Sequence, residues 1–221
     1  MTSLPQGFLV IDKQSGWTSH DVVAKLRGLL KEKKIGHLGT LDPLATGVLV
    51  VAVGREATKQ IQFFMKLDKE YEVELELGKI SDTYDVEGQI QETGFDLSTL
   101  DKKSVQTVLE GFWGESLQMP PAFSAKKING KKAYELARAG KPVELKAVQV
   151  HMQGKNIEVD LPFVRFTVEV SSGTYIRSLA HDFGQKLGCG AVLTRLRRTR
   201  VGEFTLAEAR LLTDFVTPSV L

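Results

Sequence analysis

Alternating apolar and polar residues predict strands at several places along the chain. From 71 to 78 the alternation is strict, with Tyr71 and three later apolar residues on one side and glutamates between them. This pattern is typical of a strand with one buried and one solvated face. The segment at 164–170 alternates in the same way, and 7–12 is a short strand. The β-branched run at 48–54 predicts a strand that is buried on both faces.

Apolar residues at helical spacing predict the helices. The first begins at Ser19 or the residue after it, and further helices are expected over 56–66 and 174–188. Ser98 and Asp101 resemble a capping box and precede an apolar stripe, which predicts another helix.

The order of these elements indicates the fold class. Strands are interspersed with helices without a regular βαβ repeat, which favours an α+β (mixed α/β) fold over a doubly wound one. We expect a central, mixed, mostly antiparallel sheet with flanking helices. The 221 residues suit one large domain or two small ones, and there is no repeat or convincing linker. We therefore expect one domain over residues 1–221.

Composition and charge narrow the function classes. The net charge is +2, but acidic residues dominate 68–96 and basic residues cluster at 25–34, 126–132 and 194–200. Such clusters could contact phosphates or could be ordinary solvated faces. The single Cys189 excludes an internal disulfide and makes a structural zinc site improbable. With neither a signal peptide nor a membrane-spanning stretch in the sequence, we expect a cytoplasmic protein.

The segment GHLGTLDPLATGVL, residues 36–49, contains the most informative carboxylate. Glycines permit tight turns and close approach of a ligand, and Pro43 favours an extended, stiff backbone at Asp42. Leucines nearby would lower the local dielectric around the acid. The alternative is that Asp42 caps the turn at Leu44, and spacing alone leaves both interpretations open.

The sequence lacks the residues that several other reaction classes require. The segment has no phosphate-loop spacing, no nucleophile elbow surrounds Ser171 and Ser172, and no metal-ligand cluster is present. A lone carboxylate on a rigid loop fits nucleophilic or acid–base chemistry, with a cation to orient it. Arg177 is the best candidate, where a strand leads into a helix and opposite the apolar face of that helix; a solvated or structural arginine is the alternative.

Taken together, six ordered motifs resemble those of the bacterial TruB family of tRNA pseudouridine synthases, over most of the chain from about Gly7 to Ala209. They are DKQSGWTSHDVV, GHLGTLDPLATGVL, KEYEVELELG with SDTYDVEG, QMPPAFSAKKINGKKAYELARAG, SSGTYIRSLAHDFG and LTRLRRTRVGEF. The resemblance implies a pseudouridine synthase fold with a catalytic cleft. It also implies conversion of uridine 55 in the tRNA T loop to pseudouridine, with no cofactor and no metal.

The resemblance also implies roles for individual residues. Asp42 would attack the nucleotide or abstract a ribose proton, Tyr71 would stack on the uracil, and Arg177 would pair with Asp42. The surrounding residues would complete the site: Tyr175 and Leu196 lining the pocket, His37 filling space vacated in the T loop, Lys13 supporting the loop or a phosphate, and Asp85 meeting the uracil edge or Arg177. Without the resemblance, His37 could equally bond the backbone of its own turn.

Contact with the RNA backbone would fall to the basic clusters. The candidate residues are Lys126, Lys127, Lys131, Lys132, Arg195, Arg197 and Arg198, and residues 118–160 would form an RNA-contacting insertion. We expect the T arm of tRNA as the partner, no membrane, no obligate protein partner and a monomer.

The sequence departs from the family in one respect and leaves two alternatives. Family members usually continue into a C-terminal RNA-binding domain of the PUA type, which we do not expect here. One alternative is a guide-RNA-directed relative of the box H/ACA type, in which Lys-Val typically follows the catalytic Asp-Pro in place of Leu44-Ala45. The other is an RNA-binding or RNA-folding module whose catalysis is secondary or lost.

Overall fold

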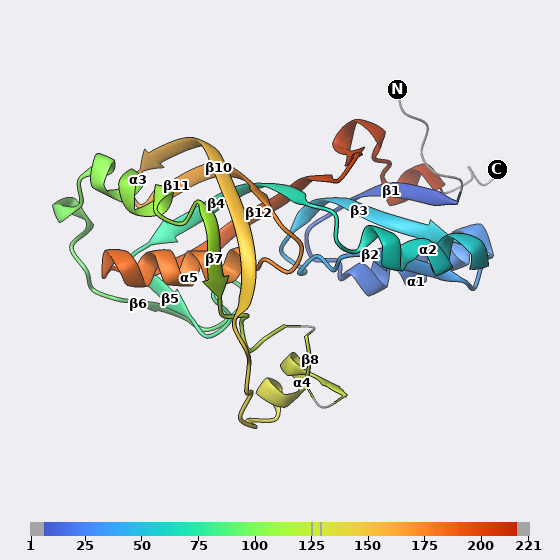
Figure 1. Cartoon of the computed structure of the whole chain (residues 1–221), viewed down its shortest axis with the longest axis horizontal. Helices are drawn as coiled ribbons and strands as arrows, with labels where there is room; N and C mark the ends of the chain where they lie inside the picture. Colours follow the sequence, from blue (N-terminus) through green and yellow to red (C-terminus); the bar gives the residue numbers. More distant parts are fainter. Residues whose placement is uncertain (1–6, 125, 129, 216–221) are drawn as a thin grey trace, which may run out of the picture. The chain divides into compact units, whose positions relative to one another are not determined.

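The computed structural model describes residues 7–124, 126–128 and 130–215 (Figure 1). The chain divides into two compact units, one of Met1–Glu72 with Leu196–Leu221 and one of Val73–Arg195. Strands β4 (Lys69–Leu77) and β12 (Ala191–Val201) contain residues of both units. In the described part of the chain, no helix is long and apolar enough to cross a membrane.

In the first unit, β3 (Thr46–Val53) is the central strand. It pairs antiparallel with β1 (Phe8–Lys13) and β2 (Ile35–Leu38), and parallel with β12, which pairs in turn with β13 (Phe204–Thr205). Residues 48–52 are fully buried, so the prediction of a strand covered on both faces is confirmed. A continuous β-branched and apolar run is stable only in such a position.

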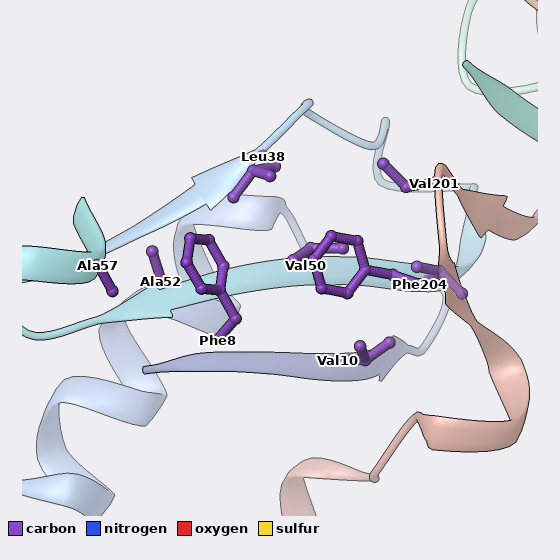
Figure 2. Packing of buried hydrophobic residues seen from close by; sticks show 9 residues of the cluster. Phe8, Val10, Leu38, Val50, Ala52, Ala57, Val201 and Phe204 are labelled. Carbon is purple, nitrogen blue, oxygen red and sulfur yellow. The ribbon is translucent and has the colours of Figure 1, made fainter. Parts of the chain in front are cut away.

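Aromatic rings organise the core of the first unit. The ring centroids of Phe8 and Phe64 lie 5.0 Å apart, and those of Phe8 and Phe204 lie 6.2 Å apart. Figure 2 shows Phe8 and Phe204 beside side chains of β1 and β3. Helix α2 (Arg55–Phe64) contributes Phe64 and covers this cluster with its apolar stripe.

Helix α1 (Ser19–Leu30) begins where the sequence predicts. Thr18 is its N-cap, and a capping box joins the Thr18 hydroxyl to the backbone of Asp21 and the Asp21 carboxylate to the backbone of Thr18. The helix ends at Lys31, whose φ of 51° is left-handed.

The second unit is built on the strand order β12-β4-β11-β10-β7. β11 (Phe163–Val170) pairs antiparallel with β10 (Val148–Asp160), which pairs antiparallel with β7 (Gly114–Gln118). The alternating burial along β4 and β11 follows the predicted one-faced pattern. The strand pairings described above are antiparallel except that of β3 with β12, and the expected α+β fold with a mostly antiparallel sheet is confirmed.

Helices α3 (Lys102–Glu110) and α5 (Ile176–Leu187) pack together in this unit. Asp101 is the N-cap of α3 and accepts a hydrogen bond from the backbone N–H of Ser104. The predicted capping box with Ser98 is therefore wrong, because Ser98 donates its hydroxyl to Asp96 in the short 3-10 turn η1 (Leu97–Thr99).

Two smaller substructures complete the second unit. β5 (Lys79–Ser81) and β6 (Ile90–Glu92) form a hairpin. Between β7 and β10, a hairpin of β8 (Lys127–Ile128) and β9 (Lys131–Lys132) leads into helix α4 (Ala133–Arg138) and projects from the ends of the two strands (Figure 1). Residues 148–160 of the predicted insertion belong to β10, so the projecting part ends before Val148.

Candidate active site

The Asp42 loop connects β2 to β3 within the first unit. The carbonyl of Asp42 accepts a hydrogen bond from the backbone N–H of Ala45 at 3.0 Å, which closes a tight turn. Leu41 and Ala45 are buried on either side of this turn. Apolar anchors therefore fix the backbone that bears the carboxylate, whereas Asp42 itself is partly exposed.

Lys13 supports this loop from the interior. Its side chain is fully buried, and its ammonium group donates to the carbonyls of Trp17 at 2.6 Å, Gln14 at 3.1 Å and Pro43 at 3.2 Å. A buried ammonium is tolerated only when oxygen atoms replace its hydration shell. The Pro43 carbonyl also accepts the backbone N–H of Gly16, so the segment after β1 holds the residue next to Asp42. Of the two predicted roles of Lys13, this geometry favours loop support.

Ser19 anchors the other neighbour of Asp42. Its hydroxyl donates to the carbonyl of Leu41 at 3.1 Å and accepts from the backbone N–H of Leu41 at 2.9 Å. Ser19 is 1% exposed, so this two-way hydrogen bond is shielded from water.

Arg198 is a third buried support of the loop. Its Nε donates to the Val48 carbonyl at 2.7 Å and its Nη2 to the Gly39 carbonyl at 3.0 Å. It is 1% exposed, which contradicts its prediction as a phosphate contact, because a side chain this deeply buried does not reach an RNA backbone. The physical reason is its register on β12, where it faces inward with Leu196.

Gly47 is required where β3 and β12 meet. The two strands pair in parallel with Gly47 opposite Arg198. Gly47 has a φ of +95°, and a Cβ added to it would lie 2.2 Å from the Arg198 carbonyl oxygen. The glycine predicted to allow close approach of a ligand thus allows close approach of a strand.

His37 lies on β2 and packs against His20 of α1. Their ring centroids are 5.6 Å apart with an interplanar angle of 79°. Burial, helped by repulsion from His20 and Arg198, lowers the pKa of His37 from 6.5 to about 4. The ring is therefore neutral at physiological pH, and its buried Nδ1 has no hydrogen-bond partner among the described residues.

Tyr71 lies on β4 and is 8% exposed. The same inward face carries Lys69, which the sequence analysis did not single out. The Lys69 ammonium donates to the carbonyls of Met65 and Leu67, and burial together with Arg198 lowers its pKa to about 8, against the opposing effect of Asp68. Its spacing could have revealed it: Lys69 lies two residues before Tyr71, so both side chains face the same side of β4.

The remaining candidates of β12 differ in exposure. Leu196 is buried, whereas Arg195 is exposed. Arg197 is partly exposed and forms an ion pair with Asp12, at 3.0 Å between Nη2 and Oδ2. The Arg197 side chain is 37% exposed, and an ion pair in contact with solvent contributes at most about 1 kcal/mol.

Arg177 occupies the second position of α5, in the second unit. Although the sequence places it opposite the apolar face of the helix, Arg177 is only 5% exposed, which rules out the alternative of a solvated arginine. Its Nη1 donates to the Thr83 carbonyl at 3.0 Å, its Nη2 donates to the Phe123 carbonyl at 2.9 Å, and its Nε lies 3.5 Å from Asp85 Oδ2. Three acceptors from two segments thus fix the plane of the guanidinium.

Asp85 is built into the turn that follows β5. Its carboxylate accepts from the Thr83 hydroxyl at 2.5 Å and from the backbone N–H of Glu87 at 3.0 Å. It is 2% exposed, and its partner Arg177 is almost as deeply buried. Of the two roles predicted for Asp85, the geometry favours contact with Arg177.

Tyr175 is the N-cap of α5 and is tied to the end of β7. Gln118 donates its Nε2 to the Tyr175 carbonyl at 3.0 Å and accepts the Tyr175 N–H at 2.8 Å. One helical turn along, the Ser178 hydroxyl donates to the Met119 carbonyl at 2.7 Å. The start of α5 is therefore anchored to the same segment that supplies Phe123.

The lysine candidates lie in the projecting hairpin of the second unit. Lys131 is exposed, and Lys126 donates to the carbonyl of Lys146 at 3.2 Å. The side chains of Lys127 and Lys132 lie outside the described residues. Within the described part, no group of three or more His, Cys, Asp or Glu residues could hold a metal ion.

Comparison with known proteins identifies the family. Residues 27–176 match the model of the TruB family pseudouridylate synthase (N terminal domain). The chain belongs to the TruB family. Residues 177–217 match the tRNA pseudouridylate synthase B C-terminal domain. The family resemblance drawn from the six motifs is thereby confirmed.

Two curated relatives carry the same name. The chain is 50% identical over 204 residues to tRNA pseudouridine synthase B of Geobacter sulfurreducens, covering 92% of this chain and 66% of that protein. The protein of the same name from Clostridium acetobutylicum is 48% identical over 199 residues, covering 90% and 68%. The chain therefore spans about two thirds of the length of these TruB relatives.

Solved structures of more distant proteins share the fold. An H/ACA RNP bound to a substrate RNA containing 2'-deoxyuridine aligns with a TM-score of 0.69 and 30% identity, covering 94% of this chain and 51% of that chain. A Cbf5-Nop10-Gar1 complex aligns with a TM-score of 0.71 and 34% identity, covering 94% and 53%. The chain spans about half the length of these solved chains.

Replacing Ser19 tests the anchoring of the Asp42 loop. Ser19→Ala leaves the buried N–H and carbonyl of Leu41 without their partner, so we expect the free energy of unfolding to fall by about 1–3 kcal/mol. Amide hydrogen exchange at Leu41 should accelerate. Ser15→Ala, on the exposed turn before α1, is the matched control and should change neither quantity. Slow exchange at Leu41 in Ser19→Ala would show that the anchor lies elsewhere.

The lowered pKa of His37 gives a prediction for acid stability. Between pH 6.5 and about 4 the unfolded chain protonates this imidazole and the folded chain does not, so protonation favours unfolding as pH falls. His37→Gln removes that proton uptake, so its melting temperature should fall less from pH 7 to about pH 5 than that of the wild type. The exposed His151→Gln is the control. Parallel melting curves for wild type and His37→Gln would contradict the buried, neutral imidazole.

Proposed function

We propose that this protein is a tRNA pseudouridine synthase that converts one uridine of the T loop to pseudouridine. The observation that carries the proposal is the Asp42 loop, in which both neighbours of a partly exposed carboxylate are fixed by buried groups. A reactive carboxylate needs this rigidity, since small displacements from the productive geometry slow a reaction strongly. Membership of the TruB family supplies the reaction class.

The reaction is an isomerisation that conserves every atom of the base. The bond between N1 of uracil and C1′ of ribose breaks, the uracil rotates, and a bond forms between C5 and C1′. The proton on C5 leaves to solvent, and N1 gains a proton. No electron acceptor is needed, so a carboxylate and a stacking ring are sufficient chemistry, without a cofactor or metal.

Three residues carry out this chemistry in our proposal. Asp42 either attacks the nucleotide or removes a ribose proton. Tyr71 stacks on the extruded uracil, consistent with its place on the inward face of β4. Arg177 supplies the cation, and the acceptors around its guanidinium favour one fixed orientation. Tyr175 and Leu196 are further candidates for contact with the substrate.

The substrate in this proposal is the T arm of tRNA. A uridine inside a folded loop must leave the stack before it can react, and neutral His37 would occupy the vacated space without adding charge. Lys126, Lys127, Lys131, Lys132, Arg195 and Arg197 are the candidates for backbone contact. The protein would act in the cytoplasm as a monomer without an obligate protein partner.

A guide-RNA-directed synthase is the second candidate. The similarity to the H/ACA and Cbf5 structures favours it, at 30% and 34% identity. Identity is higher to the tRNA pseudouridine synthases B, at 50% and 48%. Leu44-Ala45 after Asp42-Pro43 also favours the tRNA enzyme.

Turnover by the protein alone separates these candidates. We expect it to release tritium from an unmodified tRNA transcript made with 5-tritiated uridine, in buffer containing EDTA and no guide RNA. Asp42→Asn should abolish release, because the amide is a poor nucleophile and base, while tRNA binding changes less than about threefold.

The other outcomes of this assay are also decisive. Binding without release by the wild type would favour an RNA-folding module, and release only with a guide RNA would favour the second candidate. Sustained release by Asp42→Asn would exclude its catalytic role. Asp68→Asn, an exposed acid of the same unit, is the matched control.

Salt dependence tests the backbone contacts. Each lost phosphate contact should lower the slope of log K against log salt by about 0.7–0.9. Lys131→Ala combined with Arg195→Ala should therefore reduce the slope by roughly 1.4–1.8, measured by filter binding of tRNA. The exposed pair Lys102→Ala with Lys103→Ala on α3 is the control. An unchanged slope would show that Lys131 and Arg195 are ordinary solvated side chains that do not contact RNA phosphates.

A further inference from the structure

Tyr84 stands at the centre of the turn that surrounds Arg177. Its φ is +66°, in the left-handed region that a bulky aromatic residue rarely adopts. The carbonyl of Thr83, just before it, accepts from Arg177, and the carboxylate of Asp85, just after it, lies beside the same guanidinium. The left-handed residue is thus the point at which the chain reverses so that both neighbours face one arginine.

A left-handed tyrosine persists only where its surroundings compensate for the strain. The Tyr84 ring stacks on His181 with a centroid distance of 4.0 Å and an interplanar angle of 14°. The Tyr84 carbonyl accepts the backbone N–H of Leu193 at 3.1 Å, and Val86 donates to the Leu193 carbonyl at 3.2 Å. The ring stack and the β12 backbone therefore hold the turn from two sides.

The stacking partner lies on the helix that bears Arg177. His181 follows Arg177 by four residues on α5, so the two side chains project from the same face one turn apart. Both members of the stack are half-buried, and burial, with the nearby Asp182, raises the pKa of the Tyr84 phenol. Helix α5 thus contacts the turn at two points, through the guanidinium of Arg177 and the imidazole of His181.

We propose that the Tyr84–His181 stack is a positioning device that fixes the Thr83–Asp85 turn and, through it, the orientation of the Arg177 guanidinium. This inference rests on the proposed function for its effect on turnover, since Arg177 is one of the catalytic residues there. Tyr84 and His181 act through Arg177 and need not touch the RNA. Hydrogen bonds within the turn set its shape, and the stack sets its place against α5.

The first test compares variants that lose or keep the stack. Tyr84→Ala and His181→Ala should each lower kcat for tritium release by about tenfold, with KM for tRNA changed less than about twofold. Tyr84→Phe and His181→Phe keep two stacked rings and should stay within about twofold of wild type. Phe95→Ala, which removes an exposed ring of the same unit, is the control. Phenylalanine variants as slow as the alanine variants would overturn the proposal, because hydroxyl or imidazole chemistry would then be responsible.

Tyr84→Gly separates the ring from the backbone. Glycine adopts a φ of +66° without strain, so this variant removes the stack while sparing the fold. A kcat lowered like that of Tyr84→Ala supports the proposal, and a wild-type kcat contradicts it. In an Arg177→Lys background, Tyr84→Gly should lower kcat less than about twofold further, since the group that the stack orients is already gone. A full additional loss would show that the stack acts independently of Arg177.

A measurement without RNA separates this inference from the proposed function. Hydrogen exchange of the Arg177 Nε–H, followed by NMR, should accelerate in Tyr84→Gly and His181→Ala and stay slow in Tyr84→Phe. If the wild type turns over no tRNA while this exchange pattern holds, the proposed function fails and the positioning device stands. If the wild type is active and exchange is the same in all variants, the positioning device fails alone.

Discussion

The burial of two cations against backbone carbonyls is the interaction on which the candidate site depends. Lys13 and Arg198 are each almost completely removed from water, and each donates to carbonyls of the segment that surrounds Asp42. A buried cation without oxygen partners would cost several kcal/mol, so the loop and the cations stabilise each other's positions. The rigidity of the loop follows from this mutual requirement more than from its proline.

The second unit also holds a charged group in a fixed position, but there the group that is held is a cation. There the candidate functional group is the buried Arg177, and the backbone and a buried aspartate hold it. In the first unit the candidate is the carboxylate of Asp42, and buried cations hold the loop that carries it. In both units, main-chain carbonyls are the principal acceptors, which fixes direction without adding a second full negative charge for each cation.

Sequence patterns predicted the elements whose apolar pattern is uninterrupted, such as the continuous run of β3, the alternation of β4 and the helical spacing of α5. They did not predict β12, because its inward positions include Arg198, and a charged residue interrupts the apolar alternation that marks a strand. Motifs pointed to Asp42, Tyr71 and Arg177 as candidates. No motif indicated that Arg177 and Arg198 are buried. Burial of a charge depends on carbonyls from segments distant in sequence, such as Gly39 for Arg198 and Phe123 for Arg177. The acceptors of Lys69 are local, at Met65 and Leu67, but the sequence pattern does not show that they enclose its ammonium group.

The parallel pairing of Gly47 with Arg198 changes how the segment GHLGTLDPLATGVL should be interpreted. Any side chain at Gly47 would separate two paired strands, so the sheet needs glycine there, whatever the reaction. Substitutions within this one short segment would therefore give two kinds of information. Loss of activity on replacing Asp42 would test the proposed chemistry, whereas loss of activity on replacing Gly47 would report strand packing.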